Sequence, residues 1–398
     1  MSPSRPLRHV FRGAVVFGVL AAAASCGSRT GLFGPEPPDP VPDASLDVIV
    51  PRDALADVRD DSPIDATIDV IEEPVGCVPG KFTFTLATAQ LMFVLDRSLS
   101  MNYLLTSNSP ALPGQTSRWQ ALESSLSQTI TPFTSQIAMG ARFYPAANAS
   151  STDAVLACIQ DPASGAISPA LNNAAKILDV FKKTEPIGGT PTATALQLAA
   201  QEVSSSRAVA RAMVIATDGA PNCNGSLDRN TCTCTATTPP NACRTATNGA
   251  SNCLDDARTL QTITGIVSNR RIPVYVIGIG VTASFASTLD AMAVAGGRPR
   301  AGSPKYYAAG TPADLTAAFT VVRDSVANCS YITPSSPQDP NAISVEIGGA
   351  TIARDPDHLD GWDWIDQEYG HLQLFGAACA LASATNVSGT VTCDPPDE

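Results

Sequence analysis

The sequence QLMFVL at residues 90–95, followed directly by DRSLS at residues 96–100, decides the fold. Leu91 to Leu95 form an uninterrupted apolar run, which is typical of a strand buried on both faces of a parallel sheet. The polar residues after this run have the pattern D-x-S-x-S. Ligands of open α/β sheets bind at the carboxyl ends of the strands. We therefore expect a central strand that carries a polar site at its carboxyl end.

Strands and helices alternate along the chain after this run. The sequence predicts further strands over residues 137–144, 212–216, 274–279 and 306–307, and helices over residues 118–133, 171–181, 188–203, 254–268, 285–295 and 313–327. Such alternation is typical of parallel sheets covered by helices. The predicted fold class is therefore α/β, with a doubly wound, mostly parallel sheet.

The pattern changes toward the C-terminus. Residues 342–353 read AISVEIGGATIA, which predicts a hairpin with a Gly-Gly turn, and two more short strands are expected at 372–375 and 387–391. We assign residues 77–329 to the α/β head and residues 330–398 to a small β-rich C-terminal extension.

An acidic segment at residues 355–366 surrounds Trp362 and Trp364. It lacks the EF-hand spacing and the closing Glu, so we expect an acidic turn with core tryptophans rather than a calcium loop. The two histidines outside the leader, His358 and His371, are expected to be ordinary surface or sheet residues.

Three polar loops carry the candidate site. The D-x-S-x-S motif contributes Asp96, Ser98 and Ser100, GGTPT at residues 188–192 contributes Thr190 before a helix, and TDG at residues 217–219 contributes Asp218 after a buried strand. Hydroxyl and carboxylate oxygens are hard donors that suit Mg²⁺ or Mn²⁺. A divalent-metal site is the chemistry that this set of side chains indicates.

The order of DxSxS, GGTPT and TDG on an α/β frame resembles a von Willebrand factor type A (VWA) domain with its metal-ion-dependent adhesion site. The resemblance covers about residues 77–329, and the phrases RWQAL, GARFYP, ATDGAPNC, VYVIGIG and LTAAFTVV also fit it.

The resemblance implies a role for each site residue. Ser98 and Ser100 would coordinate Mg²⁺ or Mn²⁺ directly, Thr190 directly or through water, and Asp96 and Asp218 mainly through bridging waters. A vacant position on the metal would then accept a carboxylate from a partner. There are two alternatives. In the first, the metal merely ties the three loops together. In the second, the motif is intact but binds no metal.

The first residues resemble an export signal. They carry three arginines and no acid before an apolar run of twelve residues, 13–24, which is too short to span a bilayer. The following AASCG is similar to a bacterial lipobox, so we expect residues 1–25 to be a signal peptide and Cys26 to be the lipid anchor. An ordinary secretory signal cut near Ala24 is the alternative. Gly27 after Cys26 favours the outer membrane or cell surface of a Gram-negative bacterium.

A tether is expected after the leader. Residues 26–76 are rich in Pro, Asp and Ala and hold twelve acidic and three basic side chains. Such a segment cannot bury a core, and its charges repel one another. We therefore expect an extended, disordered tether rather than an Asp-lined calcium site.

Besides Cys26 the chain has ten cysteines, which permits five disulfides in the oxidising compartment that an exported protein meets. Five of them crowd into a polar insert at residues 221–253, and with Cys158 these are expected to form three bridges near the metal loops. A zinc knuckle is the alternative. The stapled insert either sets partner specificity or is a stabilised surface loop.

The other four cysteines lie outside the insert. A bridge between Cys77 and Cys329 would join the ends of the head, and Cys379 is expected to pair with Cys393. A β-rich extension this short needs such a covalent link, because it has little core of its own.

Composition excludes several functions. A formal net charge of −12 disfavours nucleic acid as a partner, because phosphate binding needs clustered Lys and Arg. The sequence contains no G-x-S-x-G, P-loop or H-E-x-x-H motif, so we do not expect an enzyme.

The expected function is that of a cell-envelope lipoprotein that binds an acidic group of a protein or envelope polymer through its metal. It would touch the membrane only through its lipid anchor. The alternative is a structural envelope-assembly scaffold whose metal only orders loops.

Overall fold

The computed structural model describes residues 74–393 apart from residues 151, 154, 161–164, 208, 237–240 and 281–282. The expected signal peptide, the Cys26 anchor and nearly all of the tether lie outside the described residues. Within the described part, no helix combines the length and the apolar character that crossing a bilayer requires.

The head is built on a six-stranded sheet with the order β5-β4-β3-β6-β7-β8. Its strands are β3 (Thr88–Asp96), β4 (Ala138–Tyr144), β5 (Ala166–Ala170), β6 (Val209–Thr217), β7 (Val274–Ile279) and β8 (Tyr307–Ala309). All neighbours are parallel except β5, which runs antiparallel to β4. The predicted α/β class with a mostly parallel sheet is confirmed.

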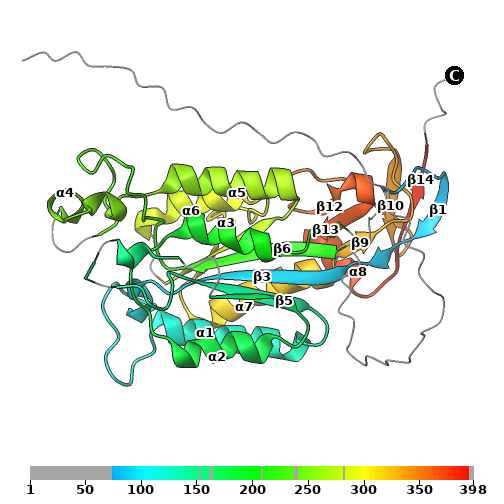
Figure 1. The fold of residues 1–398 in the computed structure, drawn as a ribbon. Helices are drawn as coiled ribbons and strands as arrows, with labels where there is room; N and C mark the ends of the chain where they lie inside the picture. The colour runs from blue at the N-terminus through cyan, green and yellow to red at the C-terminus, as the bar shows by residue number, and fades with distance from the viewer. Residues whose placement is uncertain are drawn as a thin grey trace, which may run out of the picture. The chain divides into compact units, whose positions relative to one another are not determined.

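Helices cover both faces of this sheet (Figure 1). They are α1 (Arg118–Ile130), α2 (Ala174–Lys183), α3 (Thr192–Glu202), α5 (Asp256–Arg270), α6 (Ala286–Ala295) and α7 (Pro312–Ala327). α1, α2 and α7 share one core with the sheet, whereas α3, α5 and α6 share the other.

The alternation of side chains along β3 explains the two cores. Leu91, Phe93 and Leu95 pack into the core with α1, α2 and α7, whereas Met92 and Val94 pack into the core with α3, α5 and α6. Each of these side chains is at most 3% exposed. Burying one of them stabilises the fold by about 1.5–3 kcal/mol, so an unbroken apolar run is needed only in a strand that is covered on both sides.

A second, β-rich part contains two four-stranded sheets, ordered β1-β14-β10-β11 and β12-β13-β9-β2. Its strands are β1 (Gly80–Thr83), β2 (Thr85–Leu86), β9 (Ser330–Ile332), β10 (Ile343–Ile347), β11 (Ala350–Ile352), β12 (Gly361–Asp366), β13 (His371–Phe375) and β14 (Val387–Val391), with the short helix α8 (Gly376–Ala382). They enclose a third core.

The N-terminal strands distinguish this part from the expected C-terminal extension. β1 and β2 come from residues that we assigned to the head, yet β1 pairs with β14 and β2 pairs with β9. The β-rich part therefore contains residues from both sides of the head. Such non-local pairing leaves no pattern in a short segment whose side chains are mostly exposed.

The acidic segment around the tryptophans contains a strand. Trp362 and Trp364 lie on β12, point to the same side and contact each other edge to face, with ring centroids 5.6 Å apart. They belong to the third core, as expected of core tryptophans, although we predicted a turn. Strand geometry explains both observations, because alternate residues of a strand share a face.

Two predicted disulfides are wrong. Cys77 pairs with Cys393, and Cys329 pairs with Cys379. The pairing of β1 with β14 places Gly80 opposite Val391, and this brings Cys77 next to Cys393. The bridges therefore close the β-rich part, and neither joins the two ends of the head.

Candidate metal centre

The predicted site begins at two adjacent strand ends. Asp96 is the last residue of β3, and Asp218 directly follows its parallel neighbour β6. Asp96 Oδ1 accepts a 2.7 Å hydrogen bond from the amide of Ser98, and Oδ2 accepts one of 2.5 Å from the hydroxyl of Thr217. Asp96 therefore ties the first loop to the third.

Hydroxyl groups continue this connection. The Ser98 and Ser100 Oγ atoms lie 3.1 Å apart, and Ser100 Oγ donates a 2.9 Å hydrogen bond to Asp218 Oδ1. The hydrogen-bonded chain thus contains Asp96, Ser98, Ser100 and Asp218, four of the five predicted residues. Ser98 is 2% exposed and the two carboxylates are at most 5% exposed.

Backbone hydrogen bonds place the loop of Thr190 beside the first loop. The amide of Ile187 donates to Arg97 O at 2.9 Å, and the amide of Leu99 donates to Gly188 O at 3.1 Å. Thr190 itself is held by its main chain, because its amide donates to Asn222 Oδ1 at 2.7 Å.

A glycine permits this close approach of the loops. Gly188 has φ +80°, and a Cβ there would lie 2.6 Å from the carbonyl oxygen of Ala157. Both the left-handed conformation and the contact favour glycine. This explains the first Gly of the GGTPT motif.

The site concentrates negative charge in a buried place. Burial, and after it the neighbouring Asp218 charge, raise the pKa of Asp96 to about 7, although hydrogen bonds from Thr217 and Ser98 oppose the shift. Burial also raises the pKa of Asp218, against the lowering effect of Arg118. Two buried carboxylates side by side call for a compensating positive charge.

Arg118 supplies part of this charge, and the sequence did not reveal it. Its Nη1 donates a 2.5 Å hydrogen bond to Asp218 Oδ2, and both side chains are buried. Further bonds run from Arg118 to the carbonyl oxygens of Leu104 and Ser107 and to Asn108 Oδ1. The sequence does contain a signal for the position of Arg118. Ser117 and Gln120 form a capping box at the start of α1, and this makes Arg118 the first residue of the helix.

The donor set fits a hard divalent cation. The predicted residues offer only hydroxyl and carboxylate oxygens, the ligands that Mg²⁺ and Mn²⁺ prefer. Ser98, Ser100 and Thr190 would hold the ion together with Asp218, whose Oδ1 atom faces Ser100. Asp96 orients the Ser98 amide, and Arg118 occupies the second oxygen of Asp218.

A disulfide packs against the Thr190 loop. Cys158 pairs with Cys223, and a Cβ on Gly189 would lie 2.9 Å from Cys223 Sγ. The expectation that Cys158 and the five insert cysteines form three bridges is confirmed. The bridge from the insert therefore touches a predicted metal loop.

The remaining insert cysteines form two more bridges, Cys232–Cys253 and Cys234–Cys243. The sulfur atoms of Cys232, Cys243 and Cys253 all lie within 4.8 Å of one another. Because each of these sulfurs is bonded to another sulfur, the structure favours disulfides over the alternative of a zinc knuckle. The described residues thus hold five disulfides, which is typical of an exported protein.

The sequence matches no known family profile and no curated protein. Solved structures to which the chain is similar include the PilB minor pilin from Streptococcus sanguinis, with a TM-score of 0.40 and 16% identity over 60% of this chain and 61% of that one. The SpaC pilus adhesin from Lactobacillus rhamnosus GG has a TM-score of 0.41 and 14% identity over 79% of this chain and 42% of that one.

A manganese-loaded TRAP protein from Plasmodium vivax is also similar, with a TM-score of 0.35 and 15% identity over 61% of this chain and 78% of that one. The chain thus spans less than two thirds of the two pilus proteins. These likenesses are too distant to support an argument about function, which depends on the geometry of the site.

Proposed function

We propose that this chain is an exported binding protein with a VWA-type head, which holds Mg²⁺ or Mn²⁺ in a site built from Asp96, Ser98, Ser100, Thr190 and Asp218. The observation that supports the proposal is the largely buried hydrogen-bonded chain from Asp218 through the half-buried Ser100 to Ser98 at adjacent strand ends. When bound, the metal supplies an electrophilic position for a carboxylate of a partner.

The chain's own residues would prepare this position. Asp96 fixes the Ser98 amide, so the first loop keeps its hydroxyls directed toward Asp218. Arg118 holds Asp218 Oδ2 and leaves Oδ1 beside Ser100. The partner is an acidic group of a protein or envelope polymer. We further propose that the chain is not an enzyme and that Cys26 anchors it in the outer membrane or at the cell surface.

A calorimetric titration of Mn²⁺ and Mg²⁺ into the full-length protein tests the metal site. We expect saturable binding in the wild type and its loss in the double variant Ser98→Ala/Ser100→Ala. Ser268→Ala is the matched control, because this exposed serine on α5 lies outside the three loops. Equal binding in the wild type and the double variant would contradict the proposal.

The alternative of a structural scaffold whose metal only orders loops makes a different prediction. In that case partner capture from envelope extracts would survive chelation by EDTA, whereas a metal-bridged carboxylate would be released. Readdition of Mn²⁺ should restore binding of the partner only if the metal bridges to the partner's carboxylate.

A further inference from the structure

A hollow of about 590 Å³ lies where the head meets the β-rich part. Its wall includes Tyr275 near the start of β7, Arg298 after α6, Ser325 near the end of α7 and Phe375 at the end of β13. Strand starts lie at the amino edge of a parallel sheet, so this hollow is at the opposite edge from the metal centre. Its volume is within the roughly 300–1,000 Å³ of small-molecule sites, which often lie between domains.

Arg298 is the main polar group of this wall, and it is only 6% exposed. Its Nη2 donates to Gln373 Oε1 at 2.7 Å, and its Nη1 donates to Gly297 O at 2.5 Å and lies 3.1 Å from His358 Nδ1. Its Nε is buried and has no hydrogen-bond partner among the described residues. These contacts leave the Nε–H group and one of the two N–H groups of Nη2 without a described partner.

The charge of Arg298 is not balanced by a carboxylate within the described part of the chain. Among the described residues no acid pairs with Arg298 directly. Asp363 pairs with Arg354 at 2.7 Å and reaches Arg298 only through His358, whose Nε2 lies 3.0 Å from Asp363 Oδ2, and Asp324 at the wall pairs with Arg323 at 2.7 Å. Buried charges in proteins are normally paired, because an uncompensated one is costly. An anion in this hollow would complete the environment of Arg298.

Much of the remaining wall is apolar and aromatic, although polar side chains, among them Arg300, Asp324 and His358, also line it. The guanidinium carbon of Arg298 lies 5.9 Å from the Tyr275 ring centroid and 5.2 Å from that of Phe375. Val321 and Leu359 line the hollow and are 49% and 39% exposed. These surfaces would cover an apolar group next to the anion.

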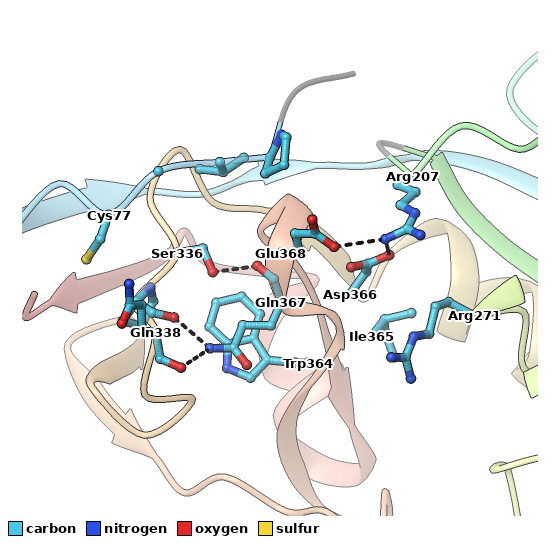
Figure 2. Close-up of a pocket in the computed structure, with 14 residues that line it drawn as sticks. Cys77, Arg207, Arg271, Ser336, Gln338, Trp364, Ile365, Asp366, Gln367 and Glu368 are labelled. Carbon is cyan, nitrogen blue, oxygen red and sulfur yellow. Dashed lines mark hydrogen bonds and ion pairs between the residues drawn. The ribbon is translucent and has the colours of Figure 1, made fainter. Parts of the chain in front are cut away.

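A second hollow, of about 710 Å³, is lined by two described arginines, of which Arg207 is ion-paired and Arg271 is exposed. Figure 2 shows Arg207 between Asp366 and Glu368, with ion-pair distances of 3.3 and 3.2 Å. Trp364 and Gln367 line the same hollow, and Gln367 bonds to the backbone of Pro337. It lacks the unpaired buried cation that distinguishes the hollow at Arg298.

We propose that the hollow at Arg298 binds a carboxylate attached to an apolar or aromatic group. The carboxylate would accept hydrogen bonds from the Arg298 guanidinium, and the apolar group would lie between Tyr275, Phe375 and Val321. A singly charged carboxylate fits better than a doubly charged phosphate, because only one guanidinium is buried in these apolar walls. Such a ligand is either a free organic acid or the C-terminal carboxylate of a peptide.

Two pairs of probes test the ligand class on the full-length, disulfide-bonded protein. The first pair is 3-phenylpropionate and its amide, and the second is acetyl-Ala-Phe and its C-terminal amide. By calorimetry we expect a Kd on the order of 1 mM or tighter for a carboxylate probe, and at least about tenfold weaker binding of its amide. If only acetyl-Ala-Phe binds, the ligand is the C-terminal carboxylate of a peptide. If 3-phenylpropionate binds as well, the site recognises the carboxylate and aromatic group that the two acids share.

Variants test the location. Arg298→Gln should weaken binding of the acid about tenfold or more. Because Arg298 also holds Gln373, Val321→Asp provides a second test, in which a negative charge at a half-exposed position repels the carboxylate. Leu171→Asp is the matched control, since Leu171 is 50% exposed and follows β5 at the other side of the sheet. No binding by either acid, equal binding of acid and amide, or unchanged binding in Val321→Asp would overturn the proposal.

Discussion

Arg118 donates a 2.5 Å hydrogen bond to Asp218, 100 residues further along the chain, and both side chains are buried. This ion pair connects the start of α1 to the end of β6. It places a fixed positive charge beside the carboxylates that we propose as part of a metal centre.

Replacement of Arg118 by Met should destabilise the protein by about 3–5 kcal/mol, because Asp218 is then left as an uncompensated buried charge. The double variant Arg118→Met/Asp218→Asn should lose less than the sum of the two single variants. Urea denaturation of the four proteins in EDTA measures the coupling free energy. Additive losses would show that the pair is not energetically coupled.

The Cys158–Cys223 bridge should support metal binding as well as stability. The bridge closes a separation of 65 residues, so its removal should cost about 4 kcal/mol in the chain-entropy description. Cys158→Ser/Cys223→Ser should also weaken Mn²⁺ binding, because the bridge packs against Gly189 beside Thr190.

The matched control for this bridge is Cys234→Ser/Cys243→Ser, which removes an insert bridge that spans only 9 residues. This variant should keep the Mn²⁺ affinity of the wild type. A similar loss of affinity in both variants would mean that the insert acts as one unit on the metal loops.

Gly188→Ala should destabilise the protein by about 1–3 kcal/mol, because alanine is strained at φ +80° and its Cβ would press on the carbonyl oxygen of Ala157. Since Gly188 O accepts from the amide of Leu99, metal affinity should fall as well. Gly225→Ala is the control, with no neighbour within 4 Å of the added Cβ. Thermal unfolding with and without Mn²⁺ measures both effects.

His371 should make stability fall in acid. Burial, and then Arg211 and Arg298, lower its pKa to about 3. In the unfolded chain the His371 imidazole has its ordinary pKa of about 6.5 and takes up a proton below that pH. In the folded chain it stays neutral until the pH approaches 3. The stabilising contribution is therefore complete above pH 6.5 and is lost progressively as the pH falls toward 3.

Between pH 7.5 and 5 this single group should cost the wild type about 2 kcal/mol of unfolding free energy. The variant His371→Gln should lack this part of the pH dependence. Denaturant titrations of both proteins across the same pH range compare the two slopes. Parallel curves would mean that His371 does not titrate in this way.

The sequence located most of the sheet because most of its strands carry a signal of their own. The apolar runs of β3, β6 and β7 are long and continuous, and Val274–Ile279 was predicted to the residue. β5 gave no such signal, since it is an edge strand with a proline and mostly half-exposed side chains. Helices with clear spacing, such as α1 and α7, were predicted within a few residues.

The candidate site was predictable to a similar degree. Asp96, Ser98, Ser100 and Asp218 were recognised from local motifs at strand ends, and the structure joins them in one hydrogen-bonded chain. Arg118 escaped notice because nothing around an arginine at the start of a helix indicates which acid it will reach. That partner is set by how α1 lies against the sheet.

The α/β class, the positions of the three polar loops and the cysteine content could be read from the sequence alone, because these depend on local patterns of apolar, polar and turn residues. The three-dimensional packing was needed to establish the pairing of β1 with β14, the bridges Cys77–Cys393 and Cys329–Cys379, and the contacts of Arg118 and Arg298. Each of these joins segments that are far apart in the chain. Their energies depend on the packing of whole elements, which no local pattern encodes.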